Sequence, residues 1–406
     1  MTNELKNVPE LRFPEFDGEW EEKRFENIFQ EISNKTSDLA KYPLYSLTVE
    51  HGITPKSDRY KRDFLVKKND NFKIVELYNI VYNPMNITLG AIDLSVYNYN
   101  IAVSGYYHVL KIIDNSNVNF LVNFLKTNQM INHYKKIATG TLIEKQRVHF
   151  SEFKNIVKKF PNINEQQKIG EFFSKLDRQI ELEEQKLEKL EEQKKGYMQQ
   201  IFSHQLIFKD KNGAIYPEWK TLKIKDIAEI LRGLTYKPKD IRVAGIRVLR
   251  SSNIIKDKFH TYKDDIFVDE SVVKTPLVNK GDILITAANG SPKLVGKHAI
   301  IEKLDDESVA GGFMYILRSD NSKFIQIWMS TVEYKRIISR VQGGNGSIGN
   351  LSRKDLENGY ITLPCDEEQN KIGSFFNKFD ELIEKQNKKI DGLKERKKGF
   401  LQKMFV

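Results

Sequence analysis

The sequence predicts an α+β fold in which two pseudo-symmetric domains are separated by two long antiparallel coiled-coil helices. Three observations support this prediction: a long internal repeat, heptad spacing of apolar residues in both copies, and short β-rich runs outside them. The predicted divisions are a first domain over 1–160, a central spacer helix over 161–203, a second domain over 204–363 and a C-terminal spacer helix over 364–406.

A long internal repeat constrains the architecture of the whole chain. Residues 161–202 align without a gap with residues 364–405 at an offset of 203, and 20 of the 42 aligned positions are identical. The two halves also begin alike, around Trp20 and Trp219, at an offset of 199. Residues 29–160 and 228–363, which lie between these anchors, have largely diverged. The repeat therefore indicates a duplicated frame that carries two different inserts.

Both copies of the repeat have the apolar spacing of a coiled coil. Seam residues recur at alternating steps of four and three, and an antiparallel pairing places Glu183 opposite Lys397 and Lys194 opposite Gln386. The two helices carry net charges of −2 and +4, which favours their pairing with each other. The alternative is two independent amphipathic helices, each packed on its own domain. The residues predicted to pair the helices are Glu183, Leu187, Leu190, Lys194, Gln386, Ile390, Leu393 and Lys397.

Two glycines, Gly196 and Gly399, interrupt these otherwise strong helical stretches at equivalent positions. Glycine within a helix costs about 1 kcal/mol relative to alanine, so its repetition suggests close packing against something. A partner subunit and the neighbouring domain are equally good candidates for that contact.

The sequence patterns of the two diverged inserts predict an α+β domain in each half. Short β-rich runs bounded by Gly, Pro and Asn predict strands, and longer amphipathic stretches predict helices. The expected strands include 80–82, 101–109, 243–249, 282–286 and 360–363, and the expected helices are 120–136 and 324–341.

Composition limits the class of protein. The chain has 406 residues and 40% hydrophobic content, which is enough for packed domains. No apolar run is long enough to span a membrane and no secretory signal is present, so we expect a cytoplasmic protein without a membrane partner. The single cysteine, Cys365, and the scattered histidines predict neither a disulfide nor a metal site.

A net charge of +10 suits a partner that carries phosphate, although a merely basic surface accounts for the charge alone equally well. Several loops add the side chains that contact nucleic-acid phosphates and base edges. Each loop by itself is as readily a solvated turn, and only the whole set favours DNA. The candidate DNA-binding residues are Lys56, Arg59, Lys61, Arg62, Asn83, Asn86, Thr141, Arg147, Arg250, Ser252, Asn253, Asn289, Ser291, Lys293, Lys297, Asn345, Ser347 and Arg353.

The sequence resembles a known family in its repeated parts. The matching segments are the opening Leu-Arg-Phe-Pro-Glu-Phe at 11–16, the tryptophan starts of both halves, residues 161–169, and residues 351–357 leading into 364–372. On these motifs the chain resembles the specificity (S) subunit of bacterial type I restriction-modification systems, over essentially its whole length. One departure is Cys365-Asp366-Glu367 in place of Asn162-Ile163-Asn164, and we expect it to be harmless.

This resemblance implies an inverted pair of target-recognition domains, each reading one half of a split site in double-stranded DNA. It also implies two modification (M) subunits that carry S-adenosylmethionine and methylate adenine N6. Restriction (R) subunits, with ATP and magnesium, then cut unmodified DNA. The resemblance gives this chain no catalytic residue and no directly bound cofactor. A helix of 38 residues spans about 57 Å, which limits the separation of the half-sites to about 17 base pairs.

Two other functions are weaker. A DNA methyltransferase acting alone needs a Gly-rich cofactor motif, which we do not find, and Asn83-Pro84-Met85-Asn86 lacks the second proline and the aromatic of an adenine-methylase motif. The Gly-rich residues 343–349 also lack the Gly-Lys-Ser/Thr ending of a phosphate-binding loop. A purely structural linker has no need to diversify its inserts while it keeps its frame. The recognised bases cannot be read from the sequence, because base readout also depends on DNA shape.

Overall fold

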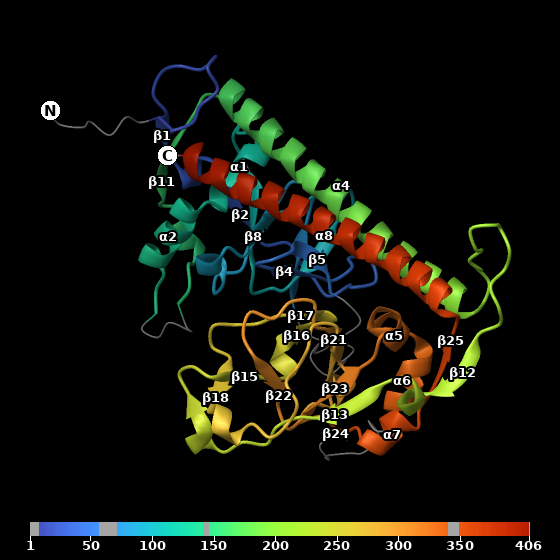
Figure 1. Ribbon diagram of the computed structural model, residues 1–406. Helices are drawn as coiled ribbons and strands as arrows, with labels where there is room; N and C mark the ends of the chain where they lie inside the picture. The colour runs from blue at the N-terminus through green and yellow to red at the C-terminus, as the bar shows by residue number, and fades with distance from the viewer. Residues whose placement is uncertain (1–7, 57–70, 141–145, 340–348, 406) are drawn as a thin grey trace. The chain divides into compact units, whose positions relative to one another are not determined.

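The computed structural model describes residues 8–56, 71–140, 146–339 and 349–405. The chain divides into two compact units, one of Met1–Lys186 with Gln386–Val406 and one of Leu187–Lys385. Both units contain strands and helices (Figure 1). The predicted α+β class is therefore confirmed.

The first unit is built on a four-stranded antiparallel sheet with strand order β2-β10-β7-β8. A second sheet has the order β3-β6-β9, and β1 pairs with β11 and β4 with β5. Its strands are β1 (Glu21–Arg24), β2 (Phe29–Ile32), β3 (Lys35–Thr36), β4 (Tyr45–Thr48), β5 (Gly52–Pro55), β6 (Phe72–Val75), β7 (Ile80–Tyr82), β8 (Ile92–Leu94), β9 (Ile101–Val103), β10 (His108–Ile112) and β11 (Val157–Phe160). Its helices are α1 (Val118–Leu125), α2 (Asn128–Ile137), α3 (Phe150–Phe153) and the start of α4 (Ile163–Phe202).

The second unit repeats the main sheet in the order β13-β23-β19-β21, but its second sheet differs. That sheet has the order β14-β18-β15-β22 and contains a parallel pair, β15 with β22. The strands are β12 (Lys220–Lys223), β13 (Glu229–Arg232), β14 (Ile241–Arg242), β15 (Ile246–Leu249), β16 (Ile254–Ile255), β17 (Lys258–Phe259), β18 (Ile266–Val268), β19 (Ile283–Thr286), β20 (Ala288–Asn289), β21 (His298–Ile300), β22 (Ser308–Ala310), β23 (Met314–Arg318), β24 (Gly349–Asn350) and β25 (Tyr360–Leu363). The helices are α5 (Ser322–Met329), α6 (Val332–Ser339), α7 (Arg353–Glu357), the end of α4 and the first half of α8 (Asp366–Lys403), whose second half belongs to the first unit.

Each single helix predicted within an insert is in fact two. The break lies before Thr127 in the first unit and before Thr331 in the second. The Thr127 hydroxyl donates to the Phe124 carbonyl and accepts from the Met130 N–H, and the Thr331 hydroxyl donates to the Trp328 carbonyl. A threonine that bonds to the backbone in this way ends one helix and caps the next, and apolar spacing does not report it.

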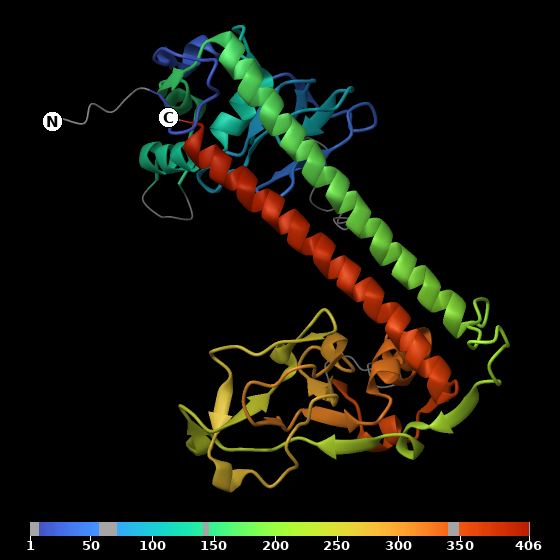
Figure 2. The ribbon, with the colours of Figure 1, turned by 45° about the horizontal axis from the view of Figure 1, so that its top comes forward.

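The core of each unit is closed by residues that come from the far end of a long helix. In the first unit Phe405, which follows α8, packs against Phe120 and Phe124 of α1 at ring-centroid distances of 5.4 and 5.9 Å. Figures 1 and 2 show the end of α8, in red, beside α1. In the second unit Phe202, the last residue of α4, packs against Phe324 of α5 at 5.8 Å. Phe405 and Phe202, which are equivalent in the repeat, thus close the hydrophobic cores of the two units in the same way.

Within each unit α4 and α8 contact each other in antiparallel fashion, but about one heptad away from the predicted register. In the first unit Lys397 Nζ donates to Asp177 at 2.5 Å, and Gln386 Nε2 donates to Glu183 at 2.8 Å. In the second unit Lys194 Nζ donates to Asp380 at 2.6 Å. The predicted pairs Glu183 with Lys397 and Lys194 with Gln386 are therefore wrong.

The physical reason is that a shift by one heptad leaves the apolar pattern unchanged. Leu393 still packs on apolar seam residues, here Leu176 and Ile180, so burial does not distinguish the two registers. Charged residues beside the seam differ between the registers, and Lys394 pairs with Glu184 at 2.6 Å in the observed one. Ile390 is buried, and Leu187 and Leu190 are half-buried.

The two helix glycines have no neighbour in the described part of the chain. A Cβ atom added to Gly196 or to Gly399 meets nothing within 4 Å. Close packing of either glycine against the neighbouring domain is therefore wrong for the described residues, and the space beside both remains open.

Candidate nucleic-acid interface

In both units, loops that carry candidate DNA-binding residues lie at the same end of the main sheet. The loop after β7 meets the segment before α3, where the Val148 N–H donates to the Pro84 carbonyl at 3.0 Å. The loop after β19 meets the segment before α7 in the same way, through the Leu351 N–H and the Ala287 carbonyl at 2.8 Å. The loop after β7 and the loop after β19 thus occupy equivalent positions in the two units, and they carry different side chains.

An exposed aromatic ring stands at this end of the sheet in each unit. Tyr106 lies in the turn between β9 and β10 and is 41% exposed, and Phe313 lies in the turn between β22 and β23 and is 72% exposed. Strand pairing makes them equivalent, because His108 pairs with Tyr82 and Tyr315 pairs with Ile285, each two residues after the aromatic. A solvent-exposed ring at a fixed position can stack on a nucleic-acid base.

The turn that carries Phe313 is held firmly by the backbone. The Phe313 carbonyl accepts hydrogen bonds from the N–H groups of Ala287 at 2.8 Å and Ala288 at 3.1 Å. Gly311 N–H donates to the Leu249 carbonyl at 2.8 Å, which ties the turn to the end of β15. These backbone hydrogen bonds therefore hold the Phe313 ring in its exposed position.

An arginine lies beside each of these turns. The Arg147 guanidinium lies over the Tyr106 ring at 5.4 Å from its centroid, and Arg250 Cγ lies 3.8 Å from where a Cβ of Gly311 would be. Both arginines have a buried Nε atom without a partner, and neither forms an ion pair among the described residues. Guanidinium groups that are not tied to a carboxylate remain available to phosphate or to guanine.

Polar groups extend the surface in the second unit. The Thr286 hydroxyl donates to the Ser251 hydroxyl at 3.1 Å, and Lys297 Nζ donates to the Ser251 carbonyl at 3.4 Å. The structure therefore brings together the predicted residues Arg250 and Lys297, with Ser252 exposed beside them. We call Tyr106, Arg147 and Asn86 the first turn surface, and Phe313, Arg250, Ser251 and Lys297 the second turn surface.

Four predicted DNA contacts have other partners in the structure. Asn253 is fully buried, where its amide donates to Asp265 at 3.0 Å and its carbonyl accepts from the Arg250 N–H. The side chains of Asn83 and Asn289 accept from the N–H groups two residues ahead, which fixes their own turns. Arg353 pairs with Glu357 within α7 at 2.5 Å. Asn253 and Asn83 are buried and hold their loops in shape, whereas Asn289 and Arg353 are partly exposed and keep other donor groups accessible.

The remaining predicted residues are either exposed or outside the described part of the chain. Lys56, Asn86, Ser291 and Lys293 are exposed in loops. Arg59, Lys61, Arg62, Thr141, Asn345 and Ser347 lie outside the described residues.

Sequence reasoning missed a buried polar cluster next to the first turn surface. His108 Nδ1 lies 2.6 Å from Glu31 Oε1, and the imidazole stacks on the Tyr82 ring at a centroid distance of 4.7 Å. Lys73 Nζ donates to the Tyr107 carbonyl at 2.8 Å. Burial lowers the pKa of His108 although Glu31 opposes this shift, so the imidazole is neutral at physiological pH. The cluster stiffens the strand that follows Tyr106.

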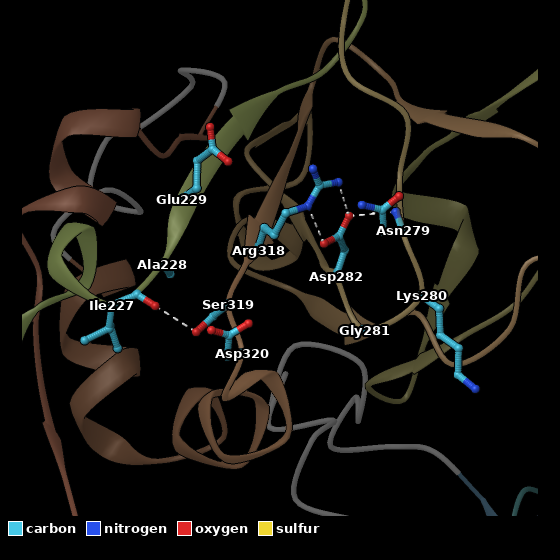
Figure 3. Close-up of a pocket in the computed structure, with 10 residues that line it drawn as sticks. All are labelled: Ile227, Ala228, Glu229, Asn279, Lys280, Gly281, Asp282, Arg318, Ser319 and Asp320. Atoms are coloured by element: carbon cyan, nitrogen blue, oxygen red, sulfur yellow. Dashed lines mark hydrogen bonds and ion pairs between the residues drawn. The ribbon is translucent and has the colours of Figure 1, made fainter. Parts of the chain in front are cut away.

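A polar pocket of about 480 Å³ lies at the other end of β23, and its charges do not suit phosphate (Figure 3). The Arg318 guanidinium donates to both oxygens of Asp282, at 2.9 and 2.7 Å, as the dashed lines in Figure 3 show. Glu229 and Asp320 add further negative charge, against which Lys280 stands alone. The pocket is therefore not part of the candidate interface.

The described residues hold neither a metal-binding cluster nor a membrane-spanning helix. They contain no group of three or more His, Cys, Asp or Glu side chains placed to hold a metal ion. Among them, too, no helix combines the length and the apolar character needed to cross a membrane.

Comparison with known proteins identifies the family that the chain matches. The family described as "Type I restriction modification DNA specificity domain" matches residues 18–192 and again residues 216–395. Similar curated proteins include the putative type I restriction enzyme MjaX specificity subunit of Methanocaldococcus jannaschii, 29% identical over 51% of this chain and 50% of that protein. The MjaVIII specificity subunit of the same organism is 24% identical over 63% of this chain and 62% of its own length. The chain thus matches about half to three fifths of these relatives.

Solved structures share the fold. A type I restriction-modification S subunit from M. genitalium superposes with a TM-score of 0.59 at 16% identity, covering 98% of this chain and 99% of that one. A structure described as the basis of complex assembly and conformational transition of the type I R-M system superposes with a TM-score of 0.56 at 15% identity, covering 95% and 97%. At this identity the likeness concerns the fold alone.

Proposed function

Because the chain belongs to the type I restriction modification DNA specificity family, we propose that it is the subunit that selects the DNA sequence in such a complex. Each unit reads one half of a bipartite site in double-stranded DNA. The observation that carries this proposal is the pair of turn surfaces, which lie at equivalent places on the main sheets of the two units and differ in their side chains. A duplicated frame with different reading groups suits two unlike half-sites.

The two turn surfaces supply the contacts. Tyr106 and Phe313 make apolar contacts with base edges such as the thymine methyl group, and Arg147 and Arg250 contact phosphate or guanine in the major groove. In the second unit the partly exposed hydroxyl of Ser251 adds a donor and an acceptor for base edges, and the buried Thr286 hydroxyl donates to it and holds it in place. Different polar groups beside a shared aromatic give each half-site its own sequence.

Chemistry in this proposal belongs to the partner subunits. Two M subunits carry S-adenosylmethionine and methylate adenine N6, and R subunits with ATP and magnesium cut unmodified DNA. This chain contributes no catalytic residue and binds no cofactor directly. Open space beside Gly196 and Gly399 supports the docking of M subunits on the long helices, since a glycine admits close approach of another backbone.

The long helices set the spacing between the half-sites. Support comes from α4, which is continuous over 40 residues and is therefore roughly 60 Å long at the usual rise per residue. A shorter helix brings the half-sites closer together, and its shortening in steps of one heptad preserves the apolar seam.

A domain exchange tests the proposal. The full chain is expressed with its M subunit in a host, and methylated adenines are mapped over the genome, which should yield one bipartite motif. Replacing residues 29–160 with those of a relative should change one half of the motif and leave the other half and the gap intact. The matched exchange of residues 228–363 should change only the other half. A single exchange that alters both halves contradicts the assignment of one unit to one half-site.

A further inference from the structure

A buried glutamate near the start of each long helix has a different partner in each repeat. In the first repeat Glu165 has no exposed side chain, and Arg12 holds its carboxylate. Arg12 Nε donates to Glu165 Oε1 at 2.8 Å, and Nη2 donates to Oε2 at 2.7 Å. The Arg12 guanidinium also donates to the carbonyls of Asp17 and Gly18. A two-point pair of this kind neutralises a carboxylate that has left water.

The second repeat lacks this arginine. Lys168 lies over the Phe13 ring in the first repeat, and Lys371 lies over the Tyr216 ring in the second, at 5.6 and 5.2 Å. This repeated contact aligns the two segments at the offset of 203, and Ile215 then takes the position of Arg12. The second copy is also four residues shorter between this point and its tryptophan, so the loop that helps to hold Arg12 has no counterpart.

Glu368, the counterpart of Glu165, is therefore buried without a cation. It is 3% exposed, and Trp219 Nε1 donates to its carboxylate at 3.1 Å. No ion pair forms at Glu368 within the part of the chain that the structure describes. Lys371 donates to the Lys209 carbonyl at 2.6 Å and is committed there. Burial raises the pKa of Glu368 above its ordinary value, although the Trp219 hydrogen bond and the nearby charges of His204 and Lys371 oppose the shift.

A pocket of about 390 Å³ lies beside this carboxylate. Its wall includes Ile215, Trp219, His204 and Glu368 itself. Ile215 is 66% exposed at its rim, so the place that Arg12 fills in the first repeat is open to solvent here. The pocket also includes Ile201 from the last turns of α4, the helix that carries Gly196.

We propose that this pocket binds an arginine side chain of a partner protein, which pairs with Glu368 as Arg12 pairs with Glu165. A guanidinium offers two parallel N–H donors to a carboxylate, and a lysine or a neutral side chain does not. The partner is the M subunit that docks on the second unit, a choice that rests on the proposed function. One repeat thus supplies the arginine itself and the other takes it from its neighbour.

The chemistry of the pocket is tested on the full chain alone. The indole N–H signals of Trp219 and Trp20 are followed by nuclear magnetic resonance during titration with N-acetyl-arginine amide. N-acetyl-citrulline amide, which has the same shape without the charge, is the matched ligand. We expect a saturable shift of the Trp219 signal, binding of citrulline at least tenfold weaker, and no shift of Trp20, whose repeat already holds Arg12. An unchanged Trp219 signal, or equal binding of both ligands, overturns the proposal.

Two variants complete the test. Glu368→Gln should abolish binding of the arginine probe, and binding equal to that of the unchanged chain overturns the proposal. Ile215→Arg places a guanidinium in the pocket from within the chain, so it should raise the thermal midpoint and block the probe even if Glu368→Gln fails to fold. A probe that still binds Ile215→Arg normally counts against the site.

The source of the arginine is tested separately. Ile215→Arg should bind purified M subunit at least tenfold more weakly than the unchanged chain does, because the pocket is already filled. Unchanged affinity overturns the M subunit as the source. If the unchanged chain itself binds no M subunit, the proposed function fails instead, and the titration with the arginine probe still decides the chemistry of the pocket.

Discussion

Gln386 on α8 donates hydrogen bonds to two oxygens of Glu183 on α4, the main-chain carbonyl and the carboxylate, each at 2.8 Å. Lys389 adds an ion pair with the same carboxylate at 3.0 Å, and Lys186 adds another at 2.9 Å. Two polar residues that interrupt the apolar seams of their own helices thus satisfy each other. This contact fixes the pairing of the two helices in the first unit.

The first prediction concerns the pH dependence of this contact. The hydrogen bond from Gln386 and those from Lys186 and Lys389 lower the pKa of Glu183 from 4.5 to about 2. The folded state therefore gains stability from the ionised carboxylate above about pH 4.5, and it loses that gain as the pH falls toward 2. We expect Glu183→Gln to be less stable than the unchanged chain at neutral pH, in urea unfolding. The difference should shrink over this acidic range, and a difference that stays constant contradicts the assigned contact.

The second prediction tests the helix register. Asp177→Lys and Lys397→Asp should each destabilise the chain by about 0.5 kcal/mol, as is usual for a partly exposed ion pair, and the double variant should recover most of that loss. The matched cycle uses Glu183→Lys with Lys397→Glu, the pair that the sequence pattern favoured. It should show no recovery in thermal unfolding. Recovery in the second cycle and none in the first restores the register predicted from the sequence.

The third prediction concerns the departure at Cys365. In the first repeat the Asn162 side chain accepts a hydrogen bond from the Glu165 N–H at 2.9 Å, which caps α4. An exposed cysteine at the equivalent position cannot do so, although α8 still begins at Asp366. Cys365→Asn should therefore stabilise the chain by about 1 kcal/mol in thermal or urea unfolding. Cys365→Ala is the control and should leave stability nearly unchanged, and a gain in both variants excludes capping as the cause.

The fourth prediction concerns the exposed aromatics. Phe313→Ala should weaken binding to DNA that carries the mapped site by roughly tenfold, because losing the contact to one base pair costs about 1–3 kcal/mol. Binding to unrelated DNA and the thermal midpoint should not change, since the ring is largely exposed. Tyr360→Ala removes another exposed aromatic of the same unit and is the control.

Base-specific fluorescence then separates the two units. With 2-aminopurine placed along each half-site, Phe313→Ala should alter the signal in one half and Tyr106→Ala in the other. Signals that both variants leave untouched, with DNA affinity also unchanged, remove these rings from the interface.

The duplicated architecture could be predicted from the sequence because the two copies of the repeat still share many identical residues. The repeat, the α+β class and the contacts of α4 with α8 follow from spacing and identity, and the family resemblance is confirmed. Register could not be predicted, since the observed and expected pairings of Glu183 share one heptad pattern.

The candidate site was harder to predict than the frame. Asn253 and Asn83 have the composition of base readers, but asparagine also holds tight turns through its own backbone, and only coordinates separate the two uses. Phe313 was missed as a contact because aromatic residues usually enter cores. A signal was present, since an aromatic recurs at the end of the same short motif, Val103 to Tyr106 and Ala310 to Phe313.

The packing of Phe405 against α1 also fixes the order in which the protein can mature on the ribosome. The second unit is one uninterrupted stretch, Leu187–Lys385, and its core is complete once that stretch has emerged. The first unit needs Met404 and Phe405, which are synthesised after the whole second unit, to close a core whose other members are made far earlier. Contrary to the usual progression from the N-terminus, we expect the later-encoded unit to mature first. The earlier one waits with an open hydrophobic face, the state in which a nascent chain most needs a chaperone.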